Sequence, residues 1–260
     1  MTGAAGLVAE NLSLRRGGAN VLRSVSAEVE AGQITAIVGP NGAGKSSLLM
    51  ALAGLLDPVG GRVCVDGREI TDFTTTERAR TIGYLPQDGA VAWDVAVETM
   101  VALGRMPHRD ARTKPHDDTH RNSVDAAIAA LDLDDLRGRP VSRLSGGEKA
   151  RALLARVLAG EPRWILADEP LAALDIAHQL SLLDHFKHCA KEGVGVIIVL
   201  HDLALAMNHA DKVIVLDQGR LAICGLAESA LAAEVIASVW RTDISWIGEE
   251  GSRALIAKRR

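Results

Sequence analysis

Aromatic residues are scarce in this chain: phenylalanine, tyrosine and tryptophan make up only 3% of its 260 residues. The core must therefore be built from alanine, leucine, valine and isoleucine. Basic residues are not in excess either, since 29 lysines and arginines face 33 acidic residues and give a formal net charge of −4. This balance argues against a generally basic protein that coats nucleic acid.

Long apolar runs and clustered cysteines are also missing. The longest apolar run, Val194–Leu200, has the length of a buried strand and falls short of the roughly 18 residues that cross a bilayer. Cys64, Cys189 and Cys224 lie far apart, so we expect neither a zinc site nor a disulfide framework, and a reducing compartment fits. Residues 1–16 lack a basic segment followed by an apolar one, so no secretory signal is expected there.

Hydrophobic residues make up 48% of the chain and charged residues 24%, a balance that excludes disorder over most of its length. The length predicts one large domain or two close subdomains. Alternating apolar and polar residues predict strands at Val8–Leu14 and Val21–Val29, with Gly17 and Gly18 as the turn between them. Short apolar runs predict further strands at Gln33–Val38, Arg62–Val65, Ile82–Leu85, Trp164–Ala167, Val194–Leu200 and Lys212–Leu216.

Helical periods dominate the middle of the chain, at Val97–Gly104, Thr119–Leu131 and Leu144–Ala159. Buried strands alternating with helices are typical of a largely parallel sheet. We therefore expect an α/β fold in which a helical subdomain, at about residues 87–160, interrupts the core. Residues 226–260 are expected to form a tail that packs on the core, with one helix around Ala227–Trp240.

A glycine-rich segment between a predicted strand and a predicted helix fits the pattern G-x-x-x-x-G-K-[ST]. Glycines allow backbone N–H groups to converge on phosphates, and the N-terminus of the following helix favours negative charge. In this context Lys45 can reach the β- and γ-phosphates of a nucleotide, and the Ser46 hydroxyl can ligate Mg²⁺. The pattern predicts a nucleotide-phosphate site formed by Gly39, Pro40, Asn41, Gly42, Ala43, Gly44, Lys45, Ser46 and Ser47.

The phosphate loop alone does not separate kinases, GTPases and transport ATPases. A second feature narrows the choice, because the apolar run Trp164–Ala167 ends in Asp168 and Glu169. Carboxylates at the C-terminal end of a strand lie where α/β sheets bind their ligands. We expect Asp168 to hold Mg²⁺, directly or through water, and Glu169 to act as the general base on an attacking water.

The segment Ser145-Gly146-Gly147-Glu148 stands at the start of a predicted helix. A serine and two glycines at a helix N-terminus form a second anion cradle. The same segment, with Leu144 before it and Arg151 behind it, resembles the signature motif of the ATP-binding cassette (ABC) ATPases. In that family the motif lies on a helical subdomain between the phosphate loop and the Asp-Glu strand, and this chain has the same order.

Three further motifs resemble those of the ABC family. Gln87 resembles the Q-loop glutamine, which touches Mg²⁺ and water and abuts the membrane partner. Ala173-Leu174-Asp175 resembles the D-loop, and His201 resembles the switch histidine that contacts the γ-phosphate. The resemblance covers roughly Leu7–Gly225. It implies an ABC ATPase domain over residues 1–225, with a P-loop NTPase (RecA-like) core, an N-terminal antiparallel β subdomain and an inserted α-helical subdomain.

ABC cassettes pack head to tail in pairs. The resemblance therefore implies that Ser145, Gly146 and Gly147 of one copy close over ATP held by Lys45 of the other. Because this chain carries one cassette, we expect a homodimer.

One departure from the family concerns adenine. The family commonly places an aromatic residue on the adenine ring just ahead of the first turn, whereas this chain has Arg15 and Arg16 there. The planar Arg16 guanidinium can stack on adenine instead, because it is weakly hydrated and packs well on π faces. The alternative is that both arginines lie in water beside the turn.

Two segments, Val101–Arg105 and Leu174–Gln179, resemble the importer ATPases for iron-siderophores, haem and cobalamin. The resemblance implies an ATP- and Mg²⁺-dependent ATPase subunit bound to transmembrane permease subunits at the cytoplasmic face of the inner membrane. It also implies an indirect partnership with a periplasmic or extracellular substrate-binding protein, and no nucleic-acid partner. The alternatives are an ABC subunit for another substrate or for export, and a soluble ABC protein of translation or DNA repair. Proteins of that last group usually carry two cassettes or a long coiled-coil insert.

Overall fold

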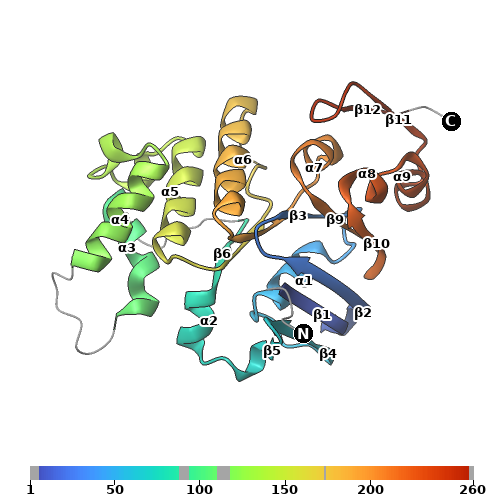
Figure 1. Ribbon diagram of the computed structural model, residues 1–260, viewed down its shortest axis with the longest axis horizontal. Coiled ribbons are helices and arrows are strands. Elements are labelled where there is room, and N and C mark those ends of the chain that lie inside the picture. The colour runs from blue at the N-terminus through green and yellow to red at the C-terminus, as the bar shows by residue number, and fades with distance from the viewer. Residues whose placement is uncertain (1–5, 88–93, 110–117, 173, 258–260) are drawn as a thin grey trace. The chain divides into compact units, whose positions relative to one another are not determined.

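Two compact units make up the chain. The first contains Met1–Asp72 and Cys189–Arg260, and the second contains Phe73–His188. The structure is a computed structural model that describes residues 6–87, 94–109, 118–172 and 174–257 (Figure 1). Along the sequence, therefore, the second unit is an insertion into the first.

The first unit opens with an antiparallel sheet in the strand order β2-β1-β4-β5. Apolar residues alternate with more exposed ones only over short stretches of these strands. A register shift between Ala9 and Leu12 in β1 allows both Leu7 and Leu12 to be buried, and Val25 of β2 is buried as well. Gly17 and Gly18 both have positive φ and form the expected turn. The strands are β1 (Gly6–Arg16), β2 (Ala19–Glu30), β4 (Gly60–Val65) and β5 (Arg68–Glu69), and a short 3₁₀ turn, η1 (Ile70–Asp72), follows them.

A second sheet in the same unit has the strand order β10-β9-β3-β8. Strand β3 (Ile34–Val38) pairs in parallel with β8 (Gly195–Val199) and with β9 (Lys212–Asp217), whereas β10 (Arg220–Leu226) is antiparallel to β9. Every residue of β3 and β8 is buried, as expected for parallel strands. Helices α1 (Lys45–Leu52) and α7 (Leu203–His209) follow the carboxyl ends of β3 and β8.

The C-terminal segment contains two helices, α8 (Ala227–Ala230) and α9 (Ala233–Trp240), followed by the hairpin of β11 (Ile244–Ile247) and β12 (Ala254–Ala257). The prediction of one helix around Ala227–Trp240 is therefore wrong. The chain breaks at Leu231 and turns to an extended conformation at Ala232, which leaves Leu231 fully buried. The sequence could not reveal this break, because the residues on both sides are good helix formers.

The hairpin is attached to the first unit by side-chain hydrogen bonds. Asn208 of α7 and the backbone of Arg253 bond reciprocally, with both nitrogen–oxygen distances at 2.8 Å. The Arg253 guanidinium also pairs with Glu228 at 2.6 Å, and the Trp246 indole N–H donates to the Leu231 carbonyl at 2.8 Å. The C-terminal segment is thus an integral part of the first unit.

The second unit contains a parallel pair of strands, β6 (Ile82–Leu85) and β7 (Trp164–Asp168), and a group of packed helices. Helices α3, α4 and α5 lie against one another (Figure 1), around the buried side chains of Met100, Ile128 and Leu154. Its helical elements are α2 (Thr75–Thr81), α3 (Val97–Ala102), η2 (Leu103–His108), α4 (Asp118–Ala130), η3 (Asp134–Leu136), η4 (Val141–Arg143), α5 (Gly146–Ala159) and α6 (Ile176–Lys191), whose last residues belong to the first unit.

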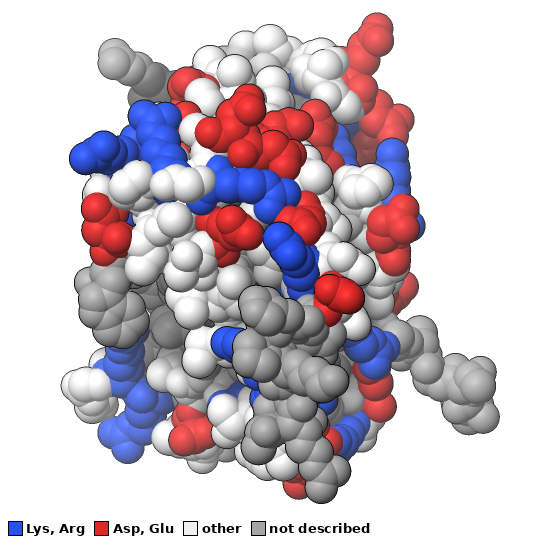
Figure 2. Space-filling model, turned by 90° about the vertical axis from the view of Figure 1, so that its left-hand side faces the viewer, with Lys and Arg blue, Asp and Glu red and all other residues white. Residues whose placement is uncertain are grey.

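Buried parallel strands in both units, an N-terminal antiparallel sheet and a group of helices inserted along the sequence confirm the predicted α/β fold class. Acidic and basic side chains are intermixed on the described part of the face shown in Figure 2. Among the described residues, no helix is both long and apolar enough to cross a bilayer.

Candidate functional site

The phosphate loop joins β3 to α1, as the sequence predicts. Its glycines are required by close backbone approaches. A Cβ atom at position 39 would lie 2.2 Å from the Leu216 carbonyl oxygen, so only glycine fits there. Gly44 has φ +98°, and a Cβ at that position would lie 2.9 Å from the Val21 carbonyl oxygen. The loop is thus held between β9 and the start of β2.

The open side of this loop is suited to an anion. Asn41 and Gly42 are exposed, and a Cβ added to Gly42 would meet no atom within 4 Å. The buried Lys45 side chain folds over the loop, and its Nζ donates to the Gly39 carbonyl at 2.9 Å and to the Pro40 carbonyl at 3.3 Å. Gly44 is the N-cap of α1 and brings no side chain to its first-turn amides. Backbone donors, an ammonium group and the half-buried Ser46 hydroxyl therefore gather in one short segment.

His201 lies at the same edge of the sheet as the phosphate loop. Val199 of β8 pairs with Ile37 of β3, and the Leu200 N–H donates to the Ile37 carbonyl at 3.1 Å. Strands β3 and β8 therefore end at the same edge of the sheet. Gly39 follows the end of β3, and His201 follows the end of β8 after Leu200. Asp202 then caps α7 by accepting from the backbone of Ala204 and Leu205.

Arg16 ends strand β1 and is exposed. Arg16 pairs with Ala19 across the turn. Ala19 stands two residues before Val21, and the Val21 carbonyl approaches Gly44 of the phosphate loop. The neighbouring Arg15 donates to the Gly18 carbonyl at 3.3 Å. The turn thus places Arg16 on the strand pair that borders the loop, and its contact with adenine stays a prediction.

The second unit brings Gln87, Asp168 and Glu169 together. Strands β6 and β7 are parallel and in register, so the residues that follow them emerge at one edge. The Gln87 amide Nε2 donates to the Glu169 carboxylate at 2.6 Å. Asp168 is buried, and the Tyr84 hydroxyl donates to its carboxylate at 3.5 Å. Burial, reinforced by the Asp168 charge, raises the pKa of Tyr84 to about 12, so this phenol stays protonated and remains a donor.

Glu169 has a left-handed backbone with φ +49°, an uncommon conformation for a non-glycine residue. Such strain persists where the surrounding structure enforces it, and it is enriched at functional sites. Here it coincides with a carboxylate that the sequence predicts to be the general base.

Ser145 is the N-cap of α5 and forms a capping box with Glu148. The Ser145 hydroxyl accepts from the Glu148 N–H at 3.2 Å, and the Glu148 carboxylate accepts from the Ser145 N–H at 2.7 Å. Hydrogen bonds from the Ser145 backbone lower the pKa of Glu148. A serine hydroxyl that accepts one bond still has its own proton to donate, so Ser145 can cap the helix and bind an anion.

Asp175 lies directly before α6, and its Oδ1 atom accepts from the His178 N–H at 2.9 Å and pairs with His178 Nδ1 at 2.6 Å. Both bonds lower the pKa of Asp175, and the backbone bond contributes more than the ring bond. The carboxylate is therefore ionised at neutral pH. Ala173 of the same motif lies outside the described residues.

Two features of the site could not be predicted from the sequence. The first is a cavity of about 330 Å³ beside the phosphate loop, to which the end of α9 contributes; it is lined by Pro40, Asn41, Gly42, Ala43, Asp217, Gln218, Val239, Trp240 and Arg241. No local pattern relates these distant segments. The second is the position of His178 against Gly147, described below, whose only sequence signal is its place three residues after Asp175.

The model of one protein family, described as ABC transporter, matches residues 22–172. This chain belongs to the ABC transporter family. The match covers more than half of the chain and confirms the resemblance drawn from its motifs. As an ABC ATPase, the protein binds and hydrolyses ATP.

Curated relatives of this ABC protein are similar over nearly its whole length. A hemin import ATP-binding protein, HmuV, of Nocardia farcinica is 44% identical over 92% of this chain and 82% of its own. The HmuV protein of Pseudomonas aeruginosa is 40% identical over 90% of this chain and 92% of its own.

Solved structures agree with the assignment of the ABC fold. One described as a metal-chelate type ABC transporter in an inward-facing conformation has a TM-score of 0.84 at 25% identity and covers 98% of each chain. The cbiO1 protein of Clostridium perfringens, part of the ABC transporter complex cbiONQ, has a TM-score of 0.78 at 28% identity over 91% of this chain and 94% of its own.

Proposed function

We propose that this ABC protein is the ATP-hydrolysing subunit of an importer for a metal chelate, with haem as the leading candidate and iron-siderophores or cobalamin as the others. The observation that carries the proposal is the similarity to hemin import ATP-binding proteins at 40–44% identity over nine-tenths of the chain. The fold of a metal-chelate type transporter supports the same class of substrate.

In this proposal the phosphate loop, residues 39–47, cradles the phosphates of ATP. Lys45 exchanges its bonds to loop carbonyls for phosphate oxygens, which is favourable because the ammonium gains anionic acceptors. Arg16 stacks on the adenine. Ser46, Gln87 and Asp168 offer a hydroxyl, an amide and a carboxylate oxygen, a donor set that suits Mg²⁺. When bound, Mg²⁺ neutralises charge on the β- and γ-phosphates.

Glu169 takes the proton from the attacking water in this proposal, because a carboxylate following a strand end is placed to act as general base. Its bond with the Gln87 amide holds the carboxylate in one orientation before ATP arrives. His201 donates to the γ-phosphate, where negative charge accumulates during transfer.

The remaining motif residues act on the nucleotide of a second copy. Ser145, Gly146, Gly147 and Glu148 present the N-terminus of α5 to the ATP bound by the partner's phosphate loop, and Asp175 lies beside them on the same face of the dimer. Permease subunits bind this homodimer at the cytoplasmic face of the inner membrane. A periplasmic or extracellular substrate-binding protein delivers the chelate to the permease.

A variant of the general base tests the chemistry. Glu169→Gln should keep ATP binding, because the amide preserves size, while turnover falls by about 10²–10⁴-fold. ATP binding is measured by equilibrium titration and turnover by phosphate release. The matched control, Glu192→Gln, changes an exposed glutamate and should leave both unchanged. Turnover of Glu169→Gln within twofold of the wild type would disprove the assignment.

The transport assignment needs the permease. Proteoliposomes that contain this chain with its proposed permease partner should take up haem only with ATP and with the wild-type subunit. If the proteoliposomes hydrolyse ATP and take up a siderophore or cobalamin but no haem, the substrate is another metal chelate. The assignment as a metal-chelate importer would then still hold.

A further inference from the structure

His178 joins two parts of the proposed dimer face within one copy of the chain. Its backbone N–H and its ring Nδ1 both bond Oδ1 of Asp175, at 2.9 Å and 2.6 Å. Because the Asp175 carboxylate is ionised, it can only accept, and Nδ1 must carry the proton. The ring is therefore fixed at one end by a charge-assisted hydrogen bond.

The other side of the ring lies on Gly147 of α5. A Cβ atom added to Gly147 would lie 2.3 Å from the ring Cδ2 atom and 2.7 Å from both Cγ and Nε2. Real Cβ atoms essentially never approach other heavy atoms below 3.0 Å. The ring or the first turn of α5 would have to shift to admit such an atom, and the hydrogen bond with Asp175 opposes a shift of the ring.

This arrangement explains the glycine at position 147 without reference to nucleotide. Gly147 is buried in the first turn of α5, two residues after Ser145, where alanine would otherwise be favoured because glycine weakens helices. His178 keeps a side-chain exposure of 38%, so part of the imidazole still reaches the surface that carries Ser145 and Asp175.

We propose that His178 is a positioning residue, which holds the Asp175 carboxylate and the first turn of the Ser145–Glu148 segment in fixed relative positions. The proposal rests on the proposed function, in which both groups act on the ATP of the second copy. Loss of the ring removes the side-chain bond to Asp175 and the contact with Gly147 together, and leaves Asp175 only the backbone bond from residue 178. Because catalytic groups misplaced by about 1 Å can lose about a hundredfold in rate, the loss should fall on turnover and leave binding at Lys45 intact.

A stability cycle tests the contact independently of any activity. Gly147→Ala should lower the Tm of the full chain by about 2–12 °C, because the added methyl overpacks the ring. In a His178→Ala background the same change should leave the Tm unchanged or raise it, because alanine is the better helix former. The matched control is Gly138→Ala, where an added Cβ would meet no atom within 4 Å, and its effect should be the same in both backgrounds. Equal effects of Gly147→Ala in both backgrounds would overturn the contact.

A kinetic series tests the positioning role. His178→Ala should lower kcat by about ten- to a hundredfold with the KM for ATP within about twofold of the wild type. His178→Asn should recover most of the loss, because its amide nitrogen takes the place of Nδ1. His178→Gln should not, because its amide reaches the place of Nε2, away from Asp175. Equal kcat in the Asn and Gln variants, or an unchanged kcat in His178→Ala, would overturn the proposal. A wild-type chain without ATPase activity would instead disprove the proposed function and leave the stability cycle valid.

Discussion

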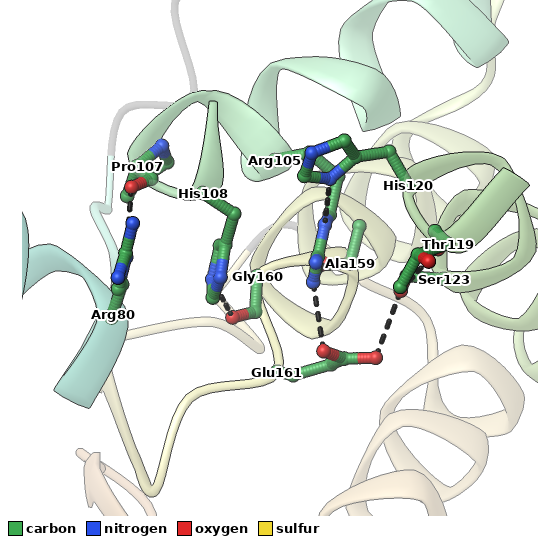
Figure 3. A network of polar contacts seen from close by, with 10 residues as sticks. All are labelled: Arg80, Arg105, Pro107, His108, Thr119, His120, Ser123, Ala159, Gly160 and Glu161. Carbon is green, nitrogen blue, oxygen red and sulfur yellow. Dashed lines mark hydrogen bonds and ion pairs between the residues drawn. The ribbon is translucent and has the colours of Figure 1, made fainter. Parts of the chain in front are cut away.

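Arg105 and Glu161 form an ion pair whose two partners differ sharply in exposure. The Arg105 side chain is 6% exposed, and the Glu161 side chain is 61% exposed. The guanidinium bonds the Glu161 carboxylate at 2.8 Å, the Ala159 carbonyl at 2.9 Å and His120 Nδ1 at 3.2 Å (Figure 3). Glu161 accepts a further bond from Ser123 at 2.8 Å. This network fixes the C-terminal end of α5, whose other end carries the Ser145 motif.

Because the two side chains differ in exposure, we expect substitution of Glu161 to cost more stability than substitution of Arg105. Glu161→Met leaves a buried guanidinium without its counter-charge. In a fully buried pair this loss lowers the free energy of unfolding by about 3–5 kcal/mol. Because Glu161 is largely exposed, we expect about 2–4 kcal/mol here. Arg105→Met returns a carboxylate to water and leaves the buried Ala159 carbonyl without this donor, for about 1–2 kcal/mol. Methionine fills most of the vacated volume in both cases.

The decisive measurement is the double variant. Glu161→Met alone leaves the Arg105 charge buried without a carboxylate partner, and adding Arg105→Met removes that charge. The double variant should therefore be more stable than Glu161→Met alone. Stability is read from urea unfolding followed by circular dichroism. Arg62→Met, which breaks the exposed pair with Glu10, is the control and should leave the midpoint unchanged. A double variant less stable than Glu161→Met alone would refute the reasoning.

The same pair predicts a pH dependence. Burial alone would raise the pKa of Glu161, but hydrogen bonds from Ser123 and Arg105 outweigh it and lower the pKa below the ordinary 4.5. A lowered pKa means that the pair stabilises the fold above pH 4.5 and that this contribution disappears as the pH falls through the folded-state value. The stability difference between the wild type and Glu161→Met should therefore shrink on acidification below that pH.

Three other predictions follow from the structure. Arg16→Ala should weaken ATP binding about two- to thirtyfold and Arg16→Tyr should restore it, as measured by titration; unchanged affinity of the alanine variant means that adenine is held elsewhere. In the proposed head-to-tail dimer, mixing Lys45→Ala chains with Gly147→Asp chains leaves one composite site intact. If a single intact site can turn over, the mixture should recover part of the ATPase activity lost in each variant alone. Gly104→Ala should destabilise the chain in thermal unfolding, since its Cβ would lie 1.9 Å from the Arg156 carbonyl oxygen, and a wild-type Tm would contradict this.

Most strands could be predicted from the sequence because their signal is local. Ile82–Leu85 was predicted with the observed bounds, and the strands at 8–14 and 164–167 differ from the observed ones by one or two residues at their ends. The single helix predicted over Ala227–Trp240 failed because periodicity reports only that a segment can be helical. In the structure the helix breaks at Leu231, which is fully buried, and periodicity does not mark that position.

The phosphate loop, the strand that precedes Glu169 and the order of the ABC motifs could all be predicted without the structure. The loop and the strand each depend on residues within about ten positions, where backbone geometry and spacing suffice, and the order of the motifs is read directly along the chain. The contacts between distant side chains became known from the fold alone. They are the His178 ring on Gly147, the Gln87 amide on Glu169 and the Arg105 guanidinium at the end of α5. These partners are 31, 82 and 54 positions apart, and packing between elements selects such contacts without leaving a local pattern.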